Sequence, residues 1–199
     1  MGWMIIFAIM TVLLALFLLN FYRDPKRTIP KGNNIVAPAD GKVINIVKVK
    51  NNAKIKKGLL GRIHILTKDI AKECYVVSIF MSPLNVHINR SPIDGVVKSI
   101  KHSKGSFFRA DDIEKSLENE KNEIIIQNKA MKVKVIQVAG FVARRIICNV
   151  KVNQKINKGG KIGMIALGSQ TTIVLPDIRL RVKLNDKVKA GETIIADLR

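Results

Sequence analysis

Apolar residues are concentrated at the start of this chain, whereas charged residues are spread over the remainder. No charged side chain occurs from Gly2 to Tyr22, and the run consists mainly of Ile, Leu, Met, Phe and Val. A helix of about 20 residues, rising about 1.5 Å per residue, matches the ~30 Å hydrocarbon core of a bilayer. A cleaved signal peptide would instead have a charged start, a shorter apolar core and a small-residue cleavage site. We therefore predict that residues 1–22 form a retained, single-pass transmembrane anchor.

The residues that flank this apolar run indicate its orientation. Trp3 stands near one end, and Phe21 and Tyr22 stand at the other, where amphipathic rings suit the two membrane interfaces. Only the second end is followed at once by basic residues: Arg23, Lys26, Arg27 and Lys31. Because basic residues favour the cytoplasmic side, we expect a cell-membrane protein with its large C-terminal part in the cytoplasm.

Short strands are the predominant pattern after the anchor. Pro25 and Pro30 disfavour helix in residues 23–34, which we interpret as a linker to one domain at 35–199. The domain contains runs rich in Val and Ile and bounded by Gly, Pro or Asn, which predict strands. These runs are Lys42–Lys50, Tyr75–Met81, Val96–Ile100, Glu123–Gln127, Met131–Val138 and Arg145–Val150. One short helix is predicted at Ala110–Glu120, where Asp111 and Asp112 suit a helix start.

The C-terminal third contains an internal repeat. The segment Lys151–Gly159 is echoed by Lys183–Gly191, and Ile162 and Ile194 follow at matching offsets. Strand, polar turn, glycine and strand again is the pattern of biotinyl- and lipoyl-type β-sandwiches, although their Met-Lys-Met carrier site is missing. The sequence therefore predicts a mainly β fold, β-rich α+β with barrel-sandwich elements, predominantly antiparallel, behind the transmembrane helix.

The charge of the chain restricts its partners. The formal net charge is +20, while aromatic residues make up only 5% of the sequence. Such an excess of basic residues favours a polyanion or an anionic membrane surface. We find no zinc-ligand spacing, helix-turn-helix pattern or RNP-like aromatic motif, and the two cysteines form no metal-ligand pair. An anionic lipid surface is therefore the favoured partner, and we expect neither nucleic acid nor a metal.

Five separate motifs carry a resemblance to a known family. They are Ala37-Pro38-Ala39-Asp40-Gly41, Phe80-Met81-Ser82-Pro83-Leu84-Asn85-Val86-His87, Gly105-Ser106-Phe107-Phe108-Arg109-Ala110, Gly140-Phe141-Val142-Ala143-Arg144-Arg145-Ile146, and Leu167-Gly168-Ser169-Gln170 leading to Leu175-Pro176. In this order, behind an anchor, they resemble the phosphatidylserine decarboxylase family in its short prokaryotic form. The resemblance extends from about Phe21 to Pro176.

The resemblance implies a self-processing proenzyme. In the family, the Gly-Ser bond of the last motif cuts itself and the serine becomes a covalent pyruvoyl group. Carried over, Ser169 attacks the carbonyl of Gly168, which divides the protein into chains 1–168 and 169–199. The pyruvoyl group then forms a Schiff base with a serine phospholipid and takes up the electrons released as carbon dioxide leaves. We expect a heterodimer of the two cleaved chains, and the family suggests a dimer of these.

The same resemblance suggests roles for other residues. A serine hydroxyl needs a base, and we expect His87 to accept and return the proton while Asp40 orients its ring. Longer family members carry a second histidine where this chain has Arg90, so one histidine or two separate groups could serve cleavage and decarboxylation. Arg144, Arg145 and Phe107 are the candidates for binding the substrate, and the sequence leaves open which arginine binds the phosphate.

Two other functions remain open from the sequence. A non-catalytic, membrane-tethered biotinyl/lipoyl-like adaptor would account for the repeat, and a basic protein that holds nucleic acid at the membrane would account for the charge. Either would leave Ser169 and His87 unexplained. The substrate headgroup is the same in phosphatidylserine and in the ether-linked archaetidylserine, so the sequence does not distinguish these two lipids.

Overall fold

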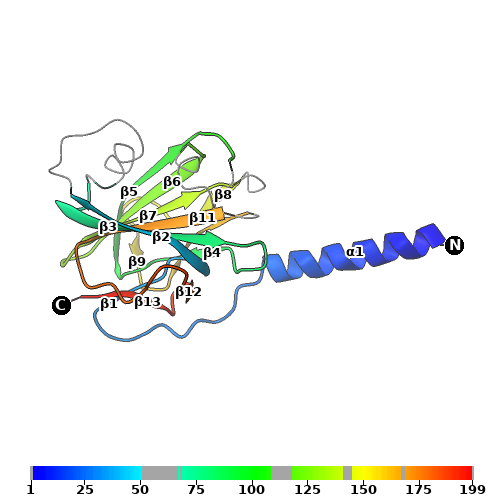
Figure 1. Cartoon of the computed structure of the whole chain (residues 1–199), viewed down its shortest axis with the longest axis horizontal. Helices are drawn as coiled ribbons and strands as arrows, with labels where there is room; N and C mark the ends of the chain where they lie inside the picture. Colours follow the sequence, from blue (N-terminus) through cyan, green and yellow to red (C-terminus); the bar gives the residue numbers. More distant parts are fainter. Residues whose placement is uncertain are drawn as a thin grey trace.

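The computed structural model describes residues 2–50, 67, 69–108, 118–140, 145–166 and 169–198. A helix, α1 (Gly2–Phe21), projects from a domain built of strands (Figure 1). All of its residues except Phe21 are wholly or partly exposed, and the helix is long and apolar enough to cross a membrane. This element has the length and composition predicted for the anchor.

Thirteen strands form three sheets among the described residues, and all pairings between these strands are antiparallel. The strands are β1 (Asn34–Val36), β2 (Gly41–Lys50), β3 (Glu73–Met81), β4 (Ile88–Arg90), β5 (Gly95–Ser103), β6 (Lys121–Gln127), β7 (Lys132–Val138), β8 (Ile146–Cys148), β9 (Lys155–Ile156), β10 (Lys161–Ile165), β11 (Ser169–Pro176), β12 (Lys187–Val188) and β13 (Ile194–Asp197). The predicted antiparallel β-rich fold is confirmed. The helix expected at 110–120 lies mostly outside the described residues.

The largest sheet has the strand order β12-β2-β3-β11-β7-β6-β5-β9, and smaller sheets join β4-β10-β8 and β1-β13. The main sheet curls around an aliphatic core to which β2, β3, β5, β6, β7 and β11 all contribute side chains. Because successive side chains of a strand point to opposite faces, alternate residues of β11 enter this core. The core contains Ile173 and Leu175, which belong to the same face as Ser169.

The predicted repeat is present as two equivalent turns. Asn153 and Asn185 both have positive φ, 68° and 73°, and Gly159 and Gly191 follow with φ of 78° and 77°. The turns are followed by β9 and β12, which pair with β5 and β2 at opposite edges of the main sheet. The strand order is therefore palindromic about the contact between β11 and β7.

A second pair of equivalent positions was not predicted from the sequence. Asp40 precedes the first residue of β2, and Asp94 precedes the first residue of β5. The Asp40 carboxylate accepts the backbone N–H of Ala190, and the Asp94 carboxylate accepts that of Lys158, both at 2.8 Å. Each aspartate thus fixes the residue before one of the two left-handed glycines, so these side chains hold the turns of the repeat in place.

Residues 23–33, which we call the belt, run from the end of α1 along the β-domain to β1 (Figure 1). The side chain of Ile29 packs on Gly159 and Gly191, where an added Cβ would lie 2.2 Å and 3.1 Å from its terminal methyl carbon. Asp24 pairs with Arg90 and Lys161. The belt therefore connects the anchor to the domain through packed and ion-paired residues.

Candidate active site

Ser169 is the first residue of β11 and is fully buried. It lies opposite Met81, the last residue of β3, and its hydroxyl donates to the Met81 sulfur at 3.5 Å. A thioether is a weak acceptor, so this contact leaves the serine hydroxyl only loosely held. Gly168, the other half of the predicted cleavage bond, lies outside the described residues.

Polar side chains continue from Ser169 into the interior of the sheet. Thr171 also donates to Met81, at 3.3 Å, and accepts from the amide of Asn89 at 2.9 Å. Gln137 donates to Asn89 and accepts from Asn122, each at 2.9 Å. Because unpaired polar groups are costly in an aliphatic core, these paired amides hold the strands beside Ser169 in one arrangement.

His87 lies at the end of the turn that joins β3 to β4. Its Nδ1 is 2.9 Å from the carbonyl oxygen of Asn85. Because a carbonyl only accepts hydrogen bonds, Nδ1 carries the proton and Nε2 of the neutral ring has a free lone pair. Nε2 is buried and has no hydrogen-bond partner among the described residues. A buried ring nitrogen of this kind can accept a proton from a group that approaches it.

The end of α1 covers the His87 ring. The rings of Phe21 and His87 have centroids 4.2 Å apart, and both side chains are almost completely buried. Burial is the main reason that the pKa of His87 falls to about 4, and the positive charge of the nearby Arg23 also lowers it. The hydrogen bond to the Asn85 carbonyl and the charge of Asp40 raise it and only partly offset the fall. The imidazole is consequently neutral near pH 7, in the protonation state of a base.

Asp40 does not form a hydrogen bond with His87 in this structure. Its two carboxylate oxygens accept from Arg27 of the belt at 2.8 and 2.9 Å, in addition to the bond from Ala190. The side chains of Arg27 and Asp40 are 6% and 12% exposed, so the pair is well shielded from solvent. Asp40 therefore reaches His87 through its charge, while Asn85 supplies the hydrogen bond that orients the ring.

The other predicted residues are placed as follows. Arg90, which the resemblance places where longer family members carry a second histidine, is buried and bonded to Asp24 and to the carbonyl of Gly159. Arg145 is exposed just before β8, and Phe107 is partly buried after β5. Arg144 lies outside the described residues. Arg90 thus serves to attach the belt, which makes it unsuited to replace a proton-transferring histidine.

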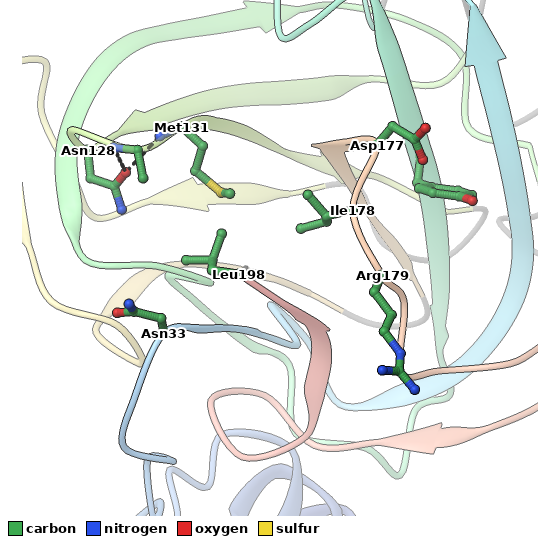
Figure 2. A pocket seen from close by; sticks show the side chains of 9 residues that line it. Asn33, Asn128, Met131, Asp177, Ile178, Arg179 and Leu198 are labelled. Atoms are coloured by element: carbon green, nitrogen blue, oxygen red, sulfur yellow. Dashed lines mark hydrogen bonds between the residues drawn. The ribbon is translucent and has the colours of Figure 1, made fainter.

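A pocket of about 730 Å³ lies far from Ser169. Figure 2 shows Met131, Ile178 and Leu198 pointing into it. Tyr75 and Asp177 also line it, and they lie at the opposite end of the β3–β11 pair from Ser169. Seven residues of strand separate Ser169 from Pro176, or roughly 23 Å at about 3.3 Å per residue. This pocket is separate from the candidate active site.

Comparison with known proteins decides the family. A model of the family described as phosphatidylserine decarboxylase matches residues 14–196. The chain belongs to the phosphatidylserine decarboxylase family. The match begins within α1, so the unit shared with the family includes the end of the helix that covers His87.

Relatives from archaea and bacteria support this membership. A Methanocaldococcus jannaschii protein, provisionally named an archaetidylserine decarboxylase proenzyme, is 48% identical over 96% of this chain and 94% of its own length. The phosphatidylserine decarboxylase proenzyme of Chlorobium limicola is 42% identical over 94% of this chain and 82% of its own. That of Cupriavidus metallidurans is 37% identical, with coverages of 94% and 80%.

Several residues around this decarboxylase-family site were missed by sequence reasoning. Phe21 was expected at a membrane interface but is buried against His87, and Arg27 was counted only as a basic flanking residue. Asn89 was not identified from the sequence as a site residue, although it hydrogen-bonds to both Thr171 and Gln137. The sequence did show an aromatic residue, Phe21, and an arginine, Arg27, close to the start of the predicted domain. Hydropathy alone, however, assigns both residues to the membrane boundary.

The depressed pKa of His87 predicts a pH-dependent stability. Because the unfolded state has the ordinary pKa of 6.5 and the folded state about 4, unfolded molecules bind more protons between these values. Stability should be full above pH 6.5 and fall by up to about 3 kcal/mol as the pH approaches 4. Denaturant unfolding of the detergent-solubilised chain measures this. His87→Gln should flatten the slope, and parallel pH profiles for wild type and His87→Gln would contradict the assignment.

Proposed function

We propose that this protein is a membrane-anchored proenzyme that cleaves itself before Ser169 and then decarboxylates a serine phospholipid. The observation that carries the proposal is the buried hydroxyl of Ser169 at the start of β11, within a chain of the phosphatidylserine decarboxylase family. The names of the relatives support a decarboxylase proenzyme acting on phosphatidylserine or archaetidylserine. The headgroup common to these two lipids is the substrate feature that we assign.

The position of Ser169 suits self-cleavage. β10 belongs to the sheet with β4 and β8, whereas β11 belongs to the main sheet, so residues 166–168 connect two sheets. A cut before Ser169 leaves β11, as the structure describes it, whole. The new chain of 31 residues would stay attached because β11 pairs along its length with β3 and over five residues with β7. The two products are thus expected to remain a heterodimer, and the family suggests that such heterodimers pair.

We assign the base for cleavage to Nε2 of His87. Ser169 would turn its hydroxyl away from Met81, transfer its proton to a base and attack the carbonyl carbon of Gly168. The peptide C–N bond breaks, an ester forms and the amine of Ser169 is released. Removal of the Cα proton of residue 169 then expels the Gly168 carboxylate, and water replaces the nitrogen, which leaves as ammonia. Asp40 favours proton uptake because its negative charge raises the pKa of His87.

The residues present fit a pyruvoyl group formed from Ser169 itself. Residue 169 is buried and held by strand pairing on its C-terminal side, and its hydroxyl hydrogen-bonds only to the weakly accepting sulfur of Met81 among the described residues. The group supplies an electron sink for loss of carbon dioxide. His87 is the candidate proton donor to the product carbon. Arg144, Arg145 and Phe107 remain candidates for holding the headgroup and its phosphate.

The membrane is where this substrate resides. We assign α1 as a single membrane-spanning anchor of the cell membrane and place the β-domain in the cytoplasm, because the basic residues follow the helix. The net charge of +20 favours an anionic lipid surface. A tethered adaptor would also explain the confirmed repeat, but it gives no role to a buried serine or to an imidazole nitrogen that has no hydrogen-bond partner in the described part of the chain.

Replacement of Ser169 should abolish processing. Ser169→Ala removes the attacking oxygen, so the chain should stay intact at 199 residues, and no carbon dioxide should be released from serine phospholipid. Mass spectrometry detects the 31-residue fragment, and radiolabelled headgroup measures decarboxylation. Ser78→Ala is the control, because Ser78 is also buried and its hydroxyl contacts Thr172 on β11. Cleavage in Ser169→Ala, or an intact chain in wild type that still releases carbon dioxide, would overturn the proposal.

The two equivalent aspartates separate catalysis from structure. Asp40→Asn keeps an oxygen for the Ala190 N–H but removes the charge near His87 and the ion pair with Arg27. Asp94→Asn makes the same change to the equivalent backbone contact in the other half of the repeat, where no arginine of the belt is bound. We expect Asp40→Asn to slow self-cleavage, because losing the negative charge lowers the pKa of His87 and makes it a weaker base, and Asp94→Asn to leave the rate near wild type. Gel time courses measure both rates; equal rates in the two variants would make Asp40 purely structural.

A further inference from the structure

The turn between β3 and β4 presents an apolar side chain at its tip. The amide oxygen of Asn85 accepts the backbone N–H and the hydroxyl of Ser82, both at 2.8 Å, and Asn85 N–H donates back to the Ser82 carbonyl. These bonds hold the turn in one conformation. Leu84 lies at its tip and is 69% exposed, the highest value for a large apolar side chain outside α1 among the described residues. An ordered turn with an exposed leucine is suited to contact another surface.

The same turn is fastened to the end of the anchor. Arg23, two residues beyond α1, donates to the carbonyl of Leu84 at 2.8 Å and to the carbonyl of Asn20 in the last turn of the helix. Tyr22 lies between Asn20 and Arg23 in the sequence. It is 60% exposed, although its ring contacts that of the buried Phe21. Leu84 and Tyr22 are therefore both exposed beside the point where the helix leaves its apolar run.

The belt fixes how the β-domain sits relative to α1. Arg27 is bound to Asp40, Ile29 packs on the two left-handed glycines, and Asp24 pairs with Arg90. Phe21 itself is 1% exposed against the domain. A helix held at its last residue and again along the belt cannot turn freely about its end. When α1 spans a bilayer, the β3–β4 turn must then lie at the boundary of that bilayer.

We infer that Leu84 and Tyr22 form a second membrane contact, in which the β3–β4 turn inserts into the lipid interface beside the end of α1. Three residues suit the lipid interface: tyrosine favours the headgroup level, the exposed Lys26 can attract anionic lipid, and the apolar leucine side chain gains from leaving water. The inference rests on the proposed membrane anchorage. It deepens the proposed function because His87 lies three residues beyond Leu84, so the turn brings the site directly to the lipid headgroups.

Exposed apolar residues elsewhere provide the comparison. Val152 is 50% exposed in the turn before β9 and lies beside Val97. β5 and β6 place Val97 opposite Ile126, close to the start of β7, whereas Ser169 and Met81 lie near the end of β7. Val152 thus lies at the end of the main sheet away from α1. Leu84 and Val152 are both at least half exposed. Of these two residues, only Leu84 accepts a hydrogen bond from Arg23, which closely follows α1.

Tryptophan fluorescence in brominated lipid tests the inference. The chain has one tryptophan, Trp3, which is 86% exposed near the start of α1. Wild type, Trp3→Phe/Leu84→Trp and Trp3→Phe/Val152→Trp are reconstituted as full chains in phosphatidylcholine–phosphatidylglycerol vesicles. The lipids carry bromine near the glycerol end of the acyl chains, and unbrominated vesicles are the reference. Bromine quenches an indole that lies in or next to the acyl region.

We expect loss of fluorescence from the wild-type indole and from the indole at position 84, with none from the indole at position 152. Quenching of the wild-type protein without quenching at position 84 would overturn the second membrane contact and leave the anchor proposal intact. Absence of quenching in wild type would overturn the anchorage and, with it, the inference. Equal quenching at positions 84 and 152 would also contradict it, because the domain would then have no fixed face toward the membrane.

Discussion

The contact between Phe21 and His87 joins the anchor of this protein to its candidate active site. A phenyl ring 4.2 Å from the imidazole removes water from one side of it, and this burial lowers the pKa of His87 to about 4. The ring is therefore neutral near pH 7, and because Nδ1 donates to a backbone carbonyl, Nε2 carries the lone pair and has no hydrogen-bond partner among the described residues. The end of α1 thus contributes to the burial that lowers the pKa of the candidate base. This makes α1 part of the candidate site, which agrees with a family match that begins within the helix.

The internal symmetry of the β-domain shows which features are specific to one half. Asp40 and Asp94 make the same hydrogen bond in the two halves, and the two left-handed glycines lie together under Ile29. Only Asp40 also binds an arginine of the belt. The belt therefore turns one of two equivalent positions into a shielded charge beside His87. We interpret the repeat as the framework, and the belt with α1 as the addition that makes one end of this framework suitable for chemistry on lipids.

The extent of sequence-based prediction follows the range of the forces involved. Strand runs such as Lys42–Lys50 and the repeat around Gly159 and Gly191 were predictable, because alternation and turn conformation are local properties. Ser169 and His87 were found through motif resemblance, and the structure buries both. The contacts of Phe21 and Arg27 were not predictable, because they depend on how the belt folds back across 13 to 66 residues of chain. Apolar or basic character next to a membrane helix is equally compatible with lipid contact and with burial against a domain.

The most direct test of this account is the titration of the His87 ring in the full chain with and without Phe21. Histidine-labelled protein in detergent micelles, with the His87 signal assigned from His87→Gln, gives the pKa by NMR. Phe17→Ala is the control, because the Phe17 ring stacks on Phe21 at 5.9 Å one turn earlier. We predict a wild-type pKa near the value of about 4 and a clear rise toward the ordinary 6.5 in Phe21→Ala, with a smaller change in Phe17→Ala. An identical pKa in wild type and Phe21→Ala would contradict the claim that the anchor forms part of the site.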